Sequence, residues 1–337
     1  MTMRAVLCKQ FGPPASLVVE EVDSLVAGPD QVVVSVHACG VNFPDTLIVE
    51  GRYQFKPPLP FSPGGEVAGV IKEVGSGVSG GSGGSGWQVG DRVIAMTTWG
   101  GYAEEVVAEA SRLVRIPEGM DFATASAFVL TYGTSQHALK DRARLQRGET
   151  LLVLGAAGGV GLAAIELGKA IGARVIAAAS SADKLALCRE HGADELINYA
   201  SEDLRTRLKE LTDGRGVDVV YDPVGGDFSE PALRSMAWNG RFLVVGFAAG
   251  KIPSIPLNLA LLKGCAIVGV FWGAFTRNEP AHHEANLQEL LALFKSGAVK
   301  PHISATYPLE RAADALHELV SRRVKGKIVL TTGRPAL

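Results

Sequence analysis

A glycine-rich segment near the middle of the chain has the spacing needed to bind a phosphate. It reads LLVLGAAGGVGLAAIELGKAIG and lies between a short apolar run, which indicates a buried strand, and a helix-forming sequence. Glycine removes the Cβ atoms that would hold a pyrophosphate away from the backbone, and it permits a tight turn. Backbone N–H groups at the start of the helix then face the anion, whose charge the helix dipole favours. The expected cofactor-binding residues of this turn are Gly155, Ala157, Gly158, Gly159, Val160 and Gly161.

The spacing of these glycines is GxxGxxG rather than the usual GxGxxG. The evidence for a dinucleotide site is therefore the context, namely a strand before the turn, a helix after it and a second strand that ends at Ser180. The alternative is a glycine turn in an α/β sheet that binds no nucleotide.

The end of the second strand indicates which dinucleotide binds. NAD sites place an Asp or Glu there for the ribose 2′-hydroxyl. This chain instead has Ser180 and Ser181, which leave room for a 2′-phosphate, and Lys184 supplies positive charge to it. Asp183 is the nearest acid and is placed to begin the next helix. We predict NADPH rather than NADH; a solvated helix position is the alternative for Lys184.

The elements around these residues are of two kinds. Residues 1–125 contain β-branched runs bounded by glycine, proline and aspartate, such as VVVSVHA and EVAGVIKEVG. Residues 126–270 alternate short apolar runs with helix-forming segments, which predicts βαβ units and a parallel sheet with helices on both faces. Two further helices, near 284–296 and 310–320, and a final strand KIVLTT complete the chain.

Composition sets broad limits on function. A chain of 337 residues with 47% apolar residues favours two domains with substantial cores. The formal net charge of −2 gives no single-sign field for nucleic acid or anionic lipid. The four scattered cysteines suit a reducing compartment, and no apolar run is long enough to span a bilayer. We expect a cytoplasmic protein that binds neither nucleic acid nor membrane.

Six short sequences spread along the chain occur together in one known superfamily. They are ACGVNFPD, PGGEVAGVIKEVG, GDRV, GGYAE, GAAGGVG and GKIVL. With them the chain resembles the medium-chain dehydrogenase/reductase superfamily over essentially its whole length. The resemblance implies an α/β protein with a GroES-like β-rich catalytic domain (1–125 and 271–337) and a Rossmann domain with a doubly wound parallel sheet (126–270).

The zinc-dependent branch of that superfamily has the sequence motifs CGxCHTD and GHE, which supply catalytic zinc ligands. This sequence keeps Cys39 from the first motif but continues with VNFPD. In the second motif glycine replaces the histidine, so that only Glu66 remains. Catalytic zinc needs three protein ligands and an open position. His37 alternates with apolar strand residues, and no four-cysteine cluster exists for a structural zinc. We predict no metal.

Without zinc, an alcohol is not easily deprotonated and a simple ketone is not polarised. The hydride acceptor must already be electrophilic, as quinones and conjugated enones or enals are. The segments VNFPDTLIVEGRY and TYGTSQHAL resemble the corresponding segments of the zinc-free, zeta-crystallin-like NADPH:quinone oxidoreductases. We predict an enzyme that transfers hydride from NADPH to quinones or related conjugated carbonyl compounds. The alternatives are a 2-enoyl-thioester or 2-alkenal reductase of the same branch and a non-catalytic NADPH-binding structural or RNA-binding protein.

The resemblance also implies roles for individual residues near the reacting atoms. Asn42 lies by the nicotinamide with Asp45 just beyond it, and Thr131 lies near the nicotinamide amide. Tyr53, in the loop GRYQF, is the candidate to hydrogen-bond the substrate oxygen, because a phenol with a pKa near 10 is a better hydrogen-bond donor than proton donor. The alternatives are a helix cap for Asn42 and loop packing for Tyr53.

Further cofactor contacts are expected near strand ends. Tyr199 matches the position where this branch contacts the 2′-phosphate, with ordinary strand packing as the alternative. Phe247 and Phe271 follow two parallel strands at their carboxyl ends, where ligands of open α/β sheets bind, although Phe271 and the adjacent tryptophan also suit a core. Lys327 in GKIVL, or Lys325 before it, reaches the cofactor if it acts as its family counterpart does; a solvated face is the alternative.

The strand CAIVGVF comes late in the Rossmann order and is expected at a sheet edge. Exposed apolar edges are usually paired or covered. We therefore expect a homodimer formed by joining two such edges, as in the superfamily.

The segment GGSGGSG, residues 80–86, has the composition of a flexible linker. Its flanks VIKEVG and WQVGDRVIAM are both strand-like and belong to the same β-rich region. We therefore predict a surface loop between two strands of one domain that carries no catalytic residue. Its regular pattern suggests an engineered insertion, and a natural repeat is the alternative.

Overall fold

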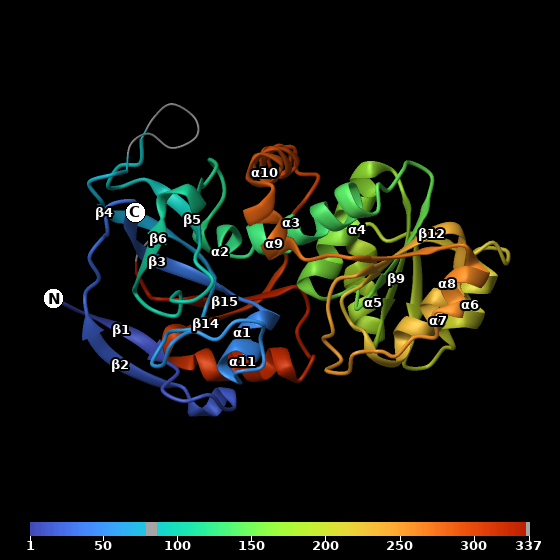
Figure 1. The fold of residues 1–337 in the computed structure, drawn as a ribbon, viewed down its shortest axis with the longest axis horizontal. Coiled ribbons are helices and arrows are strands. Elements are labelled where there is room, and N and C mark those ends of the chain that lie inside the picture. Colours follow the sequence, from blue (N-terminus) through green and yellow to red (C-terminus); the bar gives the residue numbers. More distant parts are fainter. Residues whose placement is uncertain (79–85, 335–337) are drawn as a thin grey trace. The chain divides into compact units, whose positions relative to one another are not determined.

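The chain is organised as two units in a computed structural model that describes residues 1–78 and 86–334 (Figure 1). Unit 1 comprises Met1–Val129 and Ile303–Leu337, and unit 2 comprises Leu130–His302. Each unit has its own hydrophobic core. In the described part of the chain, no helix is long and apolar enough to cross a membrane.

Unit 1 is mainly an antiparallel β-structure. Within its described residues, a seven-stranded sheet has the order β14-β15-β3-β4-β5-β7, with β6 paired to β3, and β1 and β2 form a separate pair. The central strand β3 is apolar and almost entirely buried, since it pairs with β4, β6 and β15. The strands are β1 (Thr2–Leu7), β2 (Val18–Asp23), β3 (Gln31–Val41), β4 (Glu66–Val74), β5 (Arg92–Met96), β6 (Glu105–Glu109), β7 (Leu113–Arg115), β14 (Ile303–Pro308) and β15 (Lys327–Thr331).

Short helices close the ends of this sheet. They are α1 (Phe43–Val49), α2 (Phe122–Ala125) and α11 (Ala312–Val320), with single turns η1 (Pro14–Ser16), η2 (Ala110–Arg112) and η5 (Leu309–Arg311). The amphipathic helix expected near 310–320 is therefore present as α11, and it packs against α1.

Most of the glycine–serine segment at residues 80–86 lies outside the described residues. The prediction that it is an engineered insertion concerns these residues and stays a prediction. Its flanking strands β4 and β5 pair with each other in antiparallel register from Glu66–Met96 to Val70–Arg92. The segment therefore joins two neighbouring strands of one sheet, as its flanks predicted.

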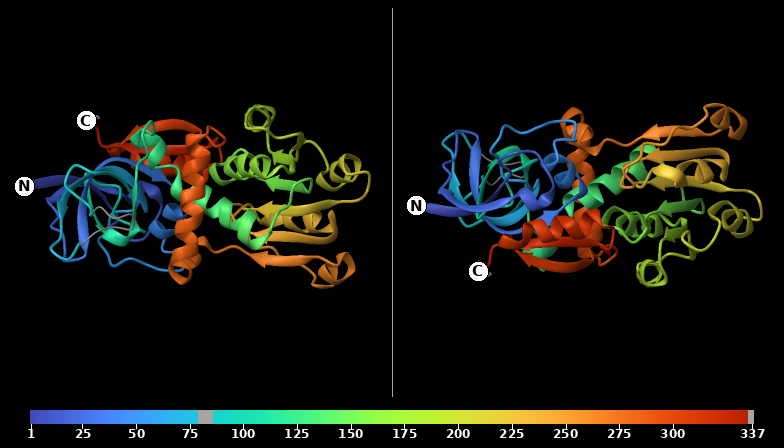
Figure 2. Two further views of the ribbon diagram at one scale, coloured as in Figure 1. Left: turned by 90° about the horizontal axis from the view of Figure 1, so that it is seen from above. Right: turned by 90° about the horizontal axis from the view of Figure 1, so that it is seen from below.

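Unit 2, which is described throughout, contains a six-stranded parallel sheet with the order β10-β9-β8-β11-β12-β13. In chain order this is 3-2-1-4-5-6, the order of doubly wound dinucleotide-binding sheets. Helices pack against both faces of the sheet (Figure 2), so the predicted α/β fold class is confirmed. The strands are β8 (Thr150–Leu154), β9 (Arg174–Ala179), β10 (Glu195–Asn198), β11 (Val217–Asp222), β12 (Met236–Val244) and β13 (Ala266–Gly269).

The helices of unit 2 precede, connect and follow these strands. They are α3 (Val129–Gln136), which continues as the π-helical η3 (His137–Arg142), then α4 (Gly159–Ile171), α5 (Ala182–Glu190), α6 (Leu204–Leu211), η4 (Gly226–Phe228), α7 (Ser229–Arg234), α8 (Asn258–Lys263), α9 (Trp272–Asn278) and α10 (Pro280–Lys295).

The chain returns to unit 1 at Ile303, whereas the sequence predicted this boundary at residue 271. Residues 271–302 belong to unit 2 because α9 and α10 pack on α3 and η3. The rings of His137 and Phe275 stack with centroids 3.9 Å apart, and Lys140 Nζ lies 2.6 Å from a carboxylate oxygen of Glu289. These contacts join segments about 140–150 residues apart in sequence, which a local pattern does not register.

Candidate active site

The glycine turn of unit 2 is a cradle made of backbone. Buried strand β8 ends at Leu154 and is followed by Gly155, whose φ of +57° is in the left-handed region; α4 begins after Gly158. A Cβ atom on Gly161 would lie 2.6 Å from the carbonyl oxygens of both Gly155 and Ala156, so a side chain there cannot be accommodated without a shift. The first intrahelical hydrogen bond runs from Leu162 N–H to Gly158 O (2.9 Å). The preceding N–H groups are therefore available to an anion, and the turn fits a dinucleotide pyrophosphate.

The predicted 2′-phosphate residues come together at the end of β9. Lys184 Nζ donates to Ser180 Oγ at 3.3 Å; Ser180 is exposed and Lys184 is half-buried. Ser181 is the N-cap residue of α5, and its hydroxyl hydrogen-bonds to the Asp183 carboxylate. Asp183 thus lies in the first turn of α5, as predicted, and the strand end itself carries hydroxyls and an ammonium rather than an acid.

Tyr199 follows β10 and lies next to this strand end. Its backbone N–H donates to Ala179 O at 3.1 Å, and its ring packs against Phe228 with centroids 4.3 Å apart. The residue is half-buried.

At the end of β11 the structure adds a residue that sequence reasoning missed. Asp222 is buried and accepts hydrogen bonds from the N–H groups of Val224 (2.9 Å) and Gly225 (2.8 Å) and from Ser229 Oγ (2.6 Å). Burial raises the pKa of this carboxyl above its ordinary value. Asp222 therefore shapes the loop at the carboxyl edge of the sheet. The sequence feature that could have revealed this residue is an acid at the end of a buried strand, directly before Pro-Val-Gly.

The aromatic residues expected at this edge have different surroundings. Phe247 follows β12, and its ring lies 2.8 Å from the place where a Cβ on Gly225 would be. Phe271 is 53% exposed and precedes α9. The indole of Trp272, in contrast, lies against Gly133 of α3, two residues after the buried Thr131. Phe271 and Trp272 therefore do not form a core pair.

In unit 1 a polar cluster forms where β3, β4 and β15 meet the start of α1. Asn42 is the N-cap residue of α1, and its backbone N–H donates to Asp45 Oδ2 at 2.8 Å. Its side-chain Nδ2 donates to Gly40 O and to Glu66 Oε2, each at 3.2 Å. Asn42 thus occupies the N-cap position of α1, and its carboxamide has partners within the protein.

Lys327 belongs to the same cluster. Its Nζ donates to Val41 O (3.1 Å) and to Asn42 Oδ1, and it lies 3.8 Å from Glu66 Oε2. Only 6% of Lys327 and none of Glu66 is exposed. The ammonium is directed into unit 1, and a contact of Lys327 with the cofactor stays a prediction. Burial lowers the pKa of this ammonium, and the nearby Glu66 and Asp45 carboxylates partly offset this by raising it.

Two further buried groups complete the cluster. Tyr102 donates its hydroxyl to Asp45 Oδ2 at 3.1 Å, and burial raises the pKa of Asp45 to about 6. Burial likewise raises the pKa of the Cys39 thiol well above its ordinary value.

Tyr53 lies in the loop after α1 and packs against the core of unit 1. Its ring makes an edge contact with Phe55, at a centroid distance of 5.0 Å, and Phe55 in turn packs against Trp99. Tyr53 itself is half-buried.

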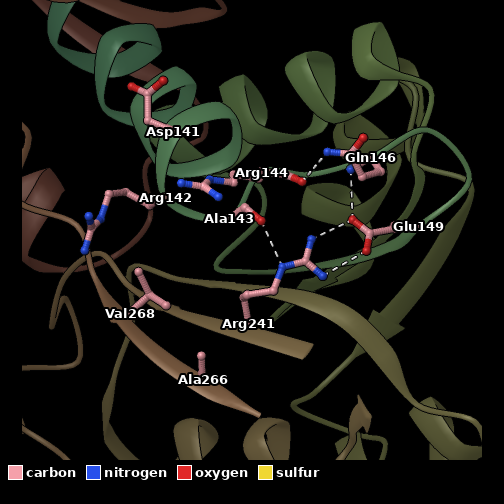
Figure 3. A pocket seen from close by; sticks show the side chains of 9 residues that line it. All are labelled: Asp141, Arg142, Ala143, Arg144, Gln146, Glu149, Arg241, Ala266 and Val268. Carbon is pink, nitrogen blue, oxygen red and sulfur yellow. Dashed lines mark hydrogen bonds and ion pairs between the residues drawn. The ribbon is translucent and has the colours of Figure 1, made fainter. Parts of the chain in front are cut away.

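A hollow of about 560 Å³ lies at the amino-terminal edge of the unit 2 sheet (Figure 3). Its lining includes Arg241 of β12, whose guanidinium pairs with Glu149 at 2.8 and 2.6 Å and also donates to Ala143 O. This edge is opposite to the glycine turn. The hollow is therefore separate from the candidate dinucleotide site.

Comparison with known proteins places this fold and these motifs in one family. Residues 28–118 match the model described as "Alcohol dehydrogenase GroES-like domain", and residues 159–294 match "Zinc-binding dehydrogenase". The chain is 43% identical over 333 residues to a "Quinone oxidoreductase-like protein 2 homolog" of Nematostella vectensis, covering 98% of this chain and 89% of that one.

Solved structures agree with this result. A quinone oxidoreductase of Pseudomonas syringae has a TM-score of 0.90 and 34% identity, covering 98% of this chain and 99% of that chain. An Escherichia coli quinone oxidoreductase complexed with NADPH has a TM-score of 0.89 and 31% identity, covering 97% and 99%. The two units define a dehydrogenase/reductase of the medium-chain type. Within that superfamily, the chain belongs to the quinone oxidoreductase family and is an oxidoreductase.

The description of the second family model raises the question of zinc. Glu66, the residue left from the zinc-ligand text, already accepts from Asn42 and pairs with the Lys327 ammonium. A cation at this distance competes with a metal ion for the same carboxylate. His37 stacks on Phe122 with ring centroids 4.2 Å apart, and the described residues hold no group of three or more His, Cys, Asp or Glu placed to bind a metal. The residues present do not fit a zinc ion.

Proposed function

We propose that the protein is an NADPH-dependent, metal-independent reductase that transfers hydride to quinones or related conjugated carbonyl compounds. The observation that carries the cofactor choice is the hydrogen bond between Lys184 and Ser180 at the end of β9, where an NAD site has a carboxylate. The acceptor class is supported by the relatives, which are named quinone oxidoreductases.

Unit 2 provides the cofactor side of this proposal. The N–H groups of residues 159–161 hold the pyrophosphate, and Ser180, Ser181, Lys184 and Tyr199 surround the 2′-phosphate. Thr131 and Phe247 contact the nicotinamide end, as does Phe271, whose exposed ring is free to pack on a ligand. Asp222 keeps the loop beside them in place.

We propose further residues for the reacting end. When bound, the nicotinamide supplies the hydride. Asn42 and Asp45 contribute to the wall beside it, and Tyr53 donates a hydrogen bond to the acceptor oxygen. Because the acceptor is already electrophilic, orientation supplies much of the rate, and the final proton comes from solvent or a hydroxyl.

The cofactor is tested by fluorescence titration of the protein with NADPH and NADH. We expect NADPH to bind about tenfold more tightly, since a charge-assisted contact to a phosphate contributes about 1–2 kcal/mol. Equal dissociation constants contradict NADPH selectivity. Elemental analysis of the same sample tests the metal, and stoichiometric zinc contradicts metal independence.

The acceptor is tested by NADPH oxidation with a naphthoquinone, a 2-alkenal and a 2-enoyl-CoA in parallel. Turnover with the quinone supports the proposal. Preferential turnover of the thioester assigns the chain to the enoyl reductases instead. Tight NADPH binding with no oxidation by any acceptor assigns it to the non-catalytic relatives.

We also propose a homodimer formed through the edge strand β13. Ile267 of β13 is 39% exposed, and nearby Trp238 and the α8 leucines Leu261 and Leu262 are 73%, 78% and 67% exposed. Exposed apolar groups around an unpaired strand edge favour association. Light scattering is expected to give twice the 35.4 kDa chain mass; a monomer mass contradicts this proposal alone.

A further inference from the structure

The orientation of the Asn42 carboxamide is set by charged neighbours on both of its ends. Its oxygen faces the Lys327 ammonium, and its NH₂ group faces the Glu66 carboxylate and Gly40 O. Turning the amide over would place its NH₂ against the ammonium and its oxygen against the carboxylate. Both contacts are repulsive, so the lysine and the glutamate together select one orientation.

The sheet register brings these groups together. Lys327 is the first residue of β15, and β15 runs antiparallel to β3 with Ile328 opposite Val41. Glu66 is the first residue of β4, on the other side of β3. The ends of three strands thus meet at the residue before α1, and Lys327 is anchored to the backbone there by its bond to Val41 O at 3.1 Å.

Burial makes this arrangement rigid. Asn42 and Lys327 are each 6% exposed, and Glu66 is fully buried. In a low-dielectric interior neither charge has water as an alternative partner, so each group stays with the partners present. A surface lysine would have several rotamers and would select no amide orientation.

We propose that Lys327 is a positioning residue, which together with Glu66 holds the Asn42 carboxamide in the one orientation needed beside the reacting end of the cofactor. The inference rests on the proposed function for the place of Asn42 in hydride transfer. It assigns to Lys327 a role through Asn42 instead of a direct cofactor contact. The competing explanation is that Lys327 only neutralises the buried charge of Glu66.

These two explanations are separated by comparing a variant that removes only the Lys327 charge with one that removes both charges. The variant Lys327→Met leaves Glu66 buried without its cation and is expected to be unstable, whereas Lys327→Met/Glu66→Gln removes both charges and is expected to regain most of the stability. If Lys327 only neutralises Glu66, the double variant also regains hydride transfer. If Lys327 positions Asn42, single-turnover hydride transfer at saturating NADPH stays roughly 10- to 100-fold slow.

The route through Asn42 is tested by a mutant cycle on the stable background. Asn42→Ala is expected to slow hydride transfer in the wild-type chain but to have little further effect in Lys327→Met/Glu66→Gln. Multiplicative effects overturn the proposal. Lys72→Met/Glu105→Gln is the matched control, because it removes another lysine–glutamate pair of unit 1, at 2.6 Å, outside the cluster; its hydride transfer is expected to match the wild type.

A readout without turnover keeps this inference separate from the proposed function. With ¹⁵N-labelled asparagine, hydrogen exchange of the Asn42 side-chain NH₂ is measured in the cofactor-free protein. We expect exchange roughly tenfold faster in Lys327→Met/Glu66→Gln than in the wild type and the Lys72 control. Unchanged exchange overturns the positioning role. A wild-type chain that reduces no acceptor but shows this change contradicts the proposed function and leaves the orientation of Asn42 by Lys327 supported.

Discussion

In unit 2 the glycine turn offers a ligand only backbone atoms, whereas in unit 1 the polar cluster consists of charged side chains enclosed by protein. The turn works because side chains are absent, as the 2.6 Å approach between a Cβ on Gly161 and two carbonyl oxygens demonstrates. The cluster works because Lys327, Glu66 and Asn42 satisfy one another. The first region is therefore sensitive to added volume and the second to added or removed charge.

The sharpest test of the charge side of this comparison is Asp45→Asn. Burial raises the pKa of Asp45 from 3.8 to about 6. A raised folded-state pKa contributes stability below pH 3.8 that is lost as the pH rises to about 6, and the loss amounts to about 3 kcal/mol. Asp45→Asn lacks this loss, so its stability relative to the wild type should rise through that window and level off above it.

The measurement is amide hydrogen exchange of β3 in unit 1 between pH 4 and 8. Asn retains an oxygen to accept from Tyr102 and from the Asn42 N–H, so the hydrogen bonds of the site are kept. Parallel pH profiles for the two proteins would show that Asp45 does not titrate in this range.

The volume side of the comparison is tested by Gly161→Ala. Its Cβ meets two backbone oxygens at 2.6 Å, so α4 or the turn must shift, which we expect to lower the free energy of unfolding by about 2 kcal/mol. The shift also displaces the N–H groups of the turn, so we expect NADPH to bind at least about tenfold more weakly. Gly273→Ala in α9 is the control, since its Cβ has its nearest neighbour at 3.7 Å. Isothermal titration of both variants decides the point; equal affinities would remove Gly161 from the cofactor cradle.

A smaller effect is expected at the exposed edge of the cofactor site. Lys184→Ala removes an ammonium that reaches Ser180 but is not enclosed by protein. We expect about tenfold weaker binding of NADPH and no change for NADH, because only NADPH has the 2′-phosphate. A loss of affinity that is the same for both dinucleotides would assign Lys184 to the stability of α5.

The smallest effect is expected at Tyr53, which belongs to neither region. Tyr53→Phe keeps the ring contact with Phe55 and removes only the hydroxyl. A neutral hydrogen bond contributes about 1 kcal/mol, so kcat/KM for a quinone should fall about fivefold. Unchanged kcat/KM for every accepted substrate would confine Tyr53 to packing of its loop.

The comparison also explains how far sequence reasoning reached. The strand–turn–helix unit, the serines at the end of β9 and the placement of Asp183 were predicted, since each depends on residues within one contiguous segment. The alternation of strands and helices likewise indicated the doubly wound sheet. Asp222 was missed, although its position before Pro-Val-Gly was visible, because the acid has no role until the loop folds back onto it.

By itself, then, the sequence determined the superfamily fold, the backbone cradle and the absence of an acid at the strand end. Only the tertiary structure decided where the chain returns to unit 1 and where Lys327 is directed. Lys327 and Val41 are 286 residues apart, and their contact depends on the register of β15 on β3. A local pattern reports which residues are apolar or flexible, whereas the partners of a buried charge are set by strand pairing across the whole chain.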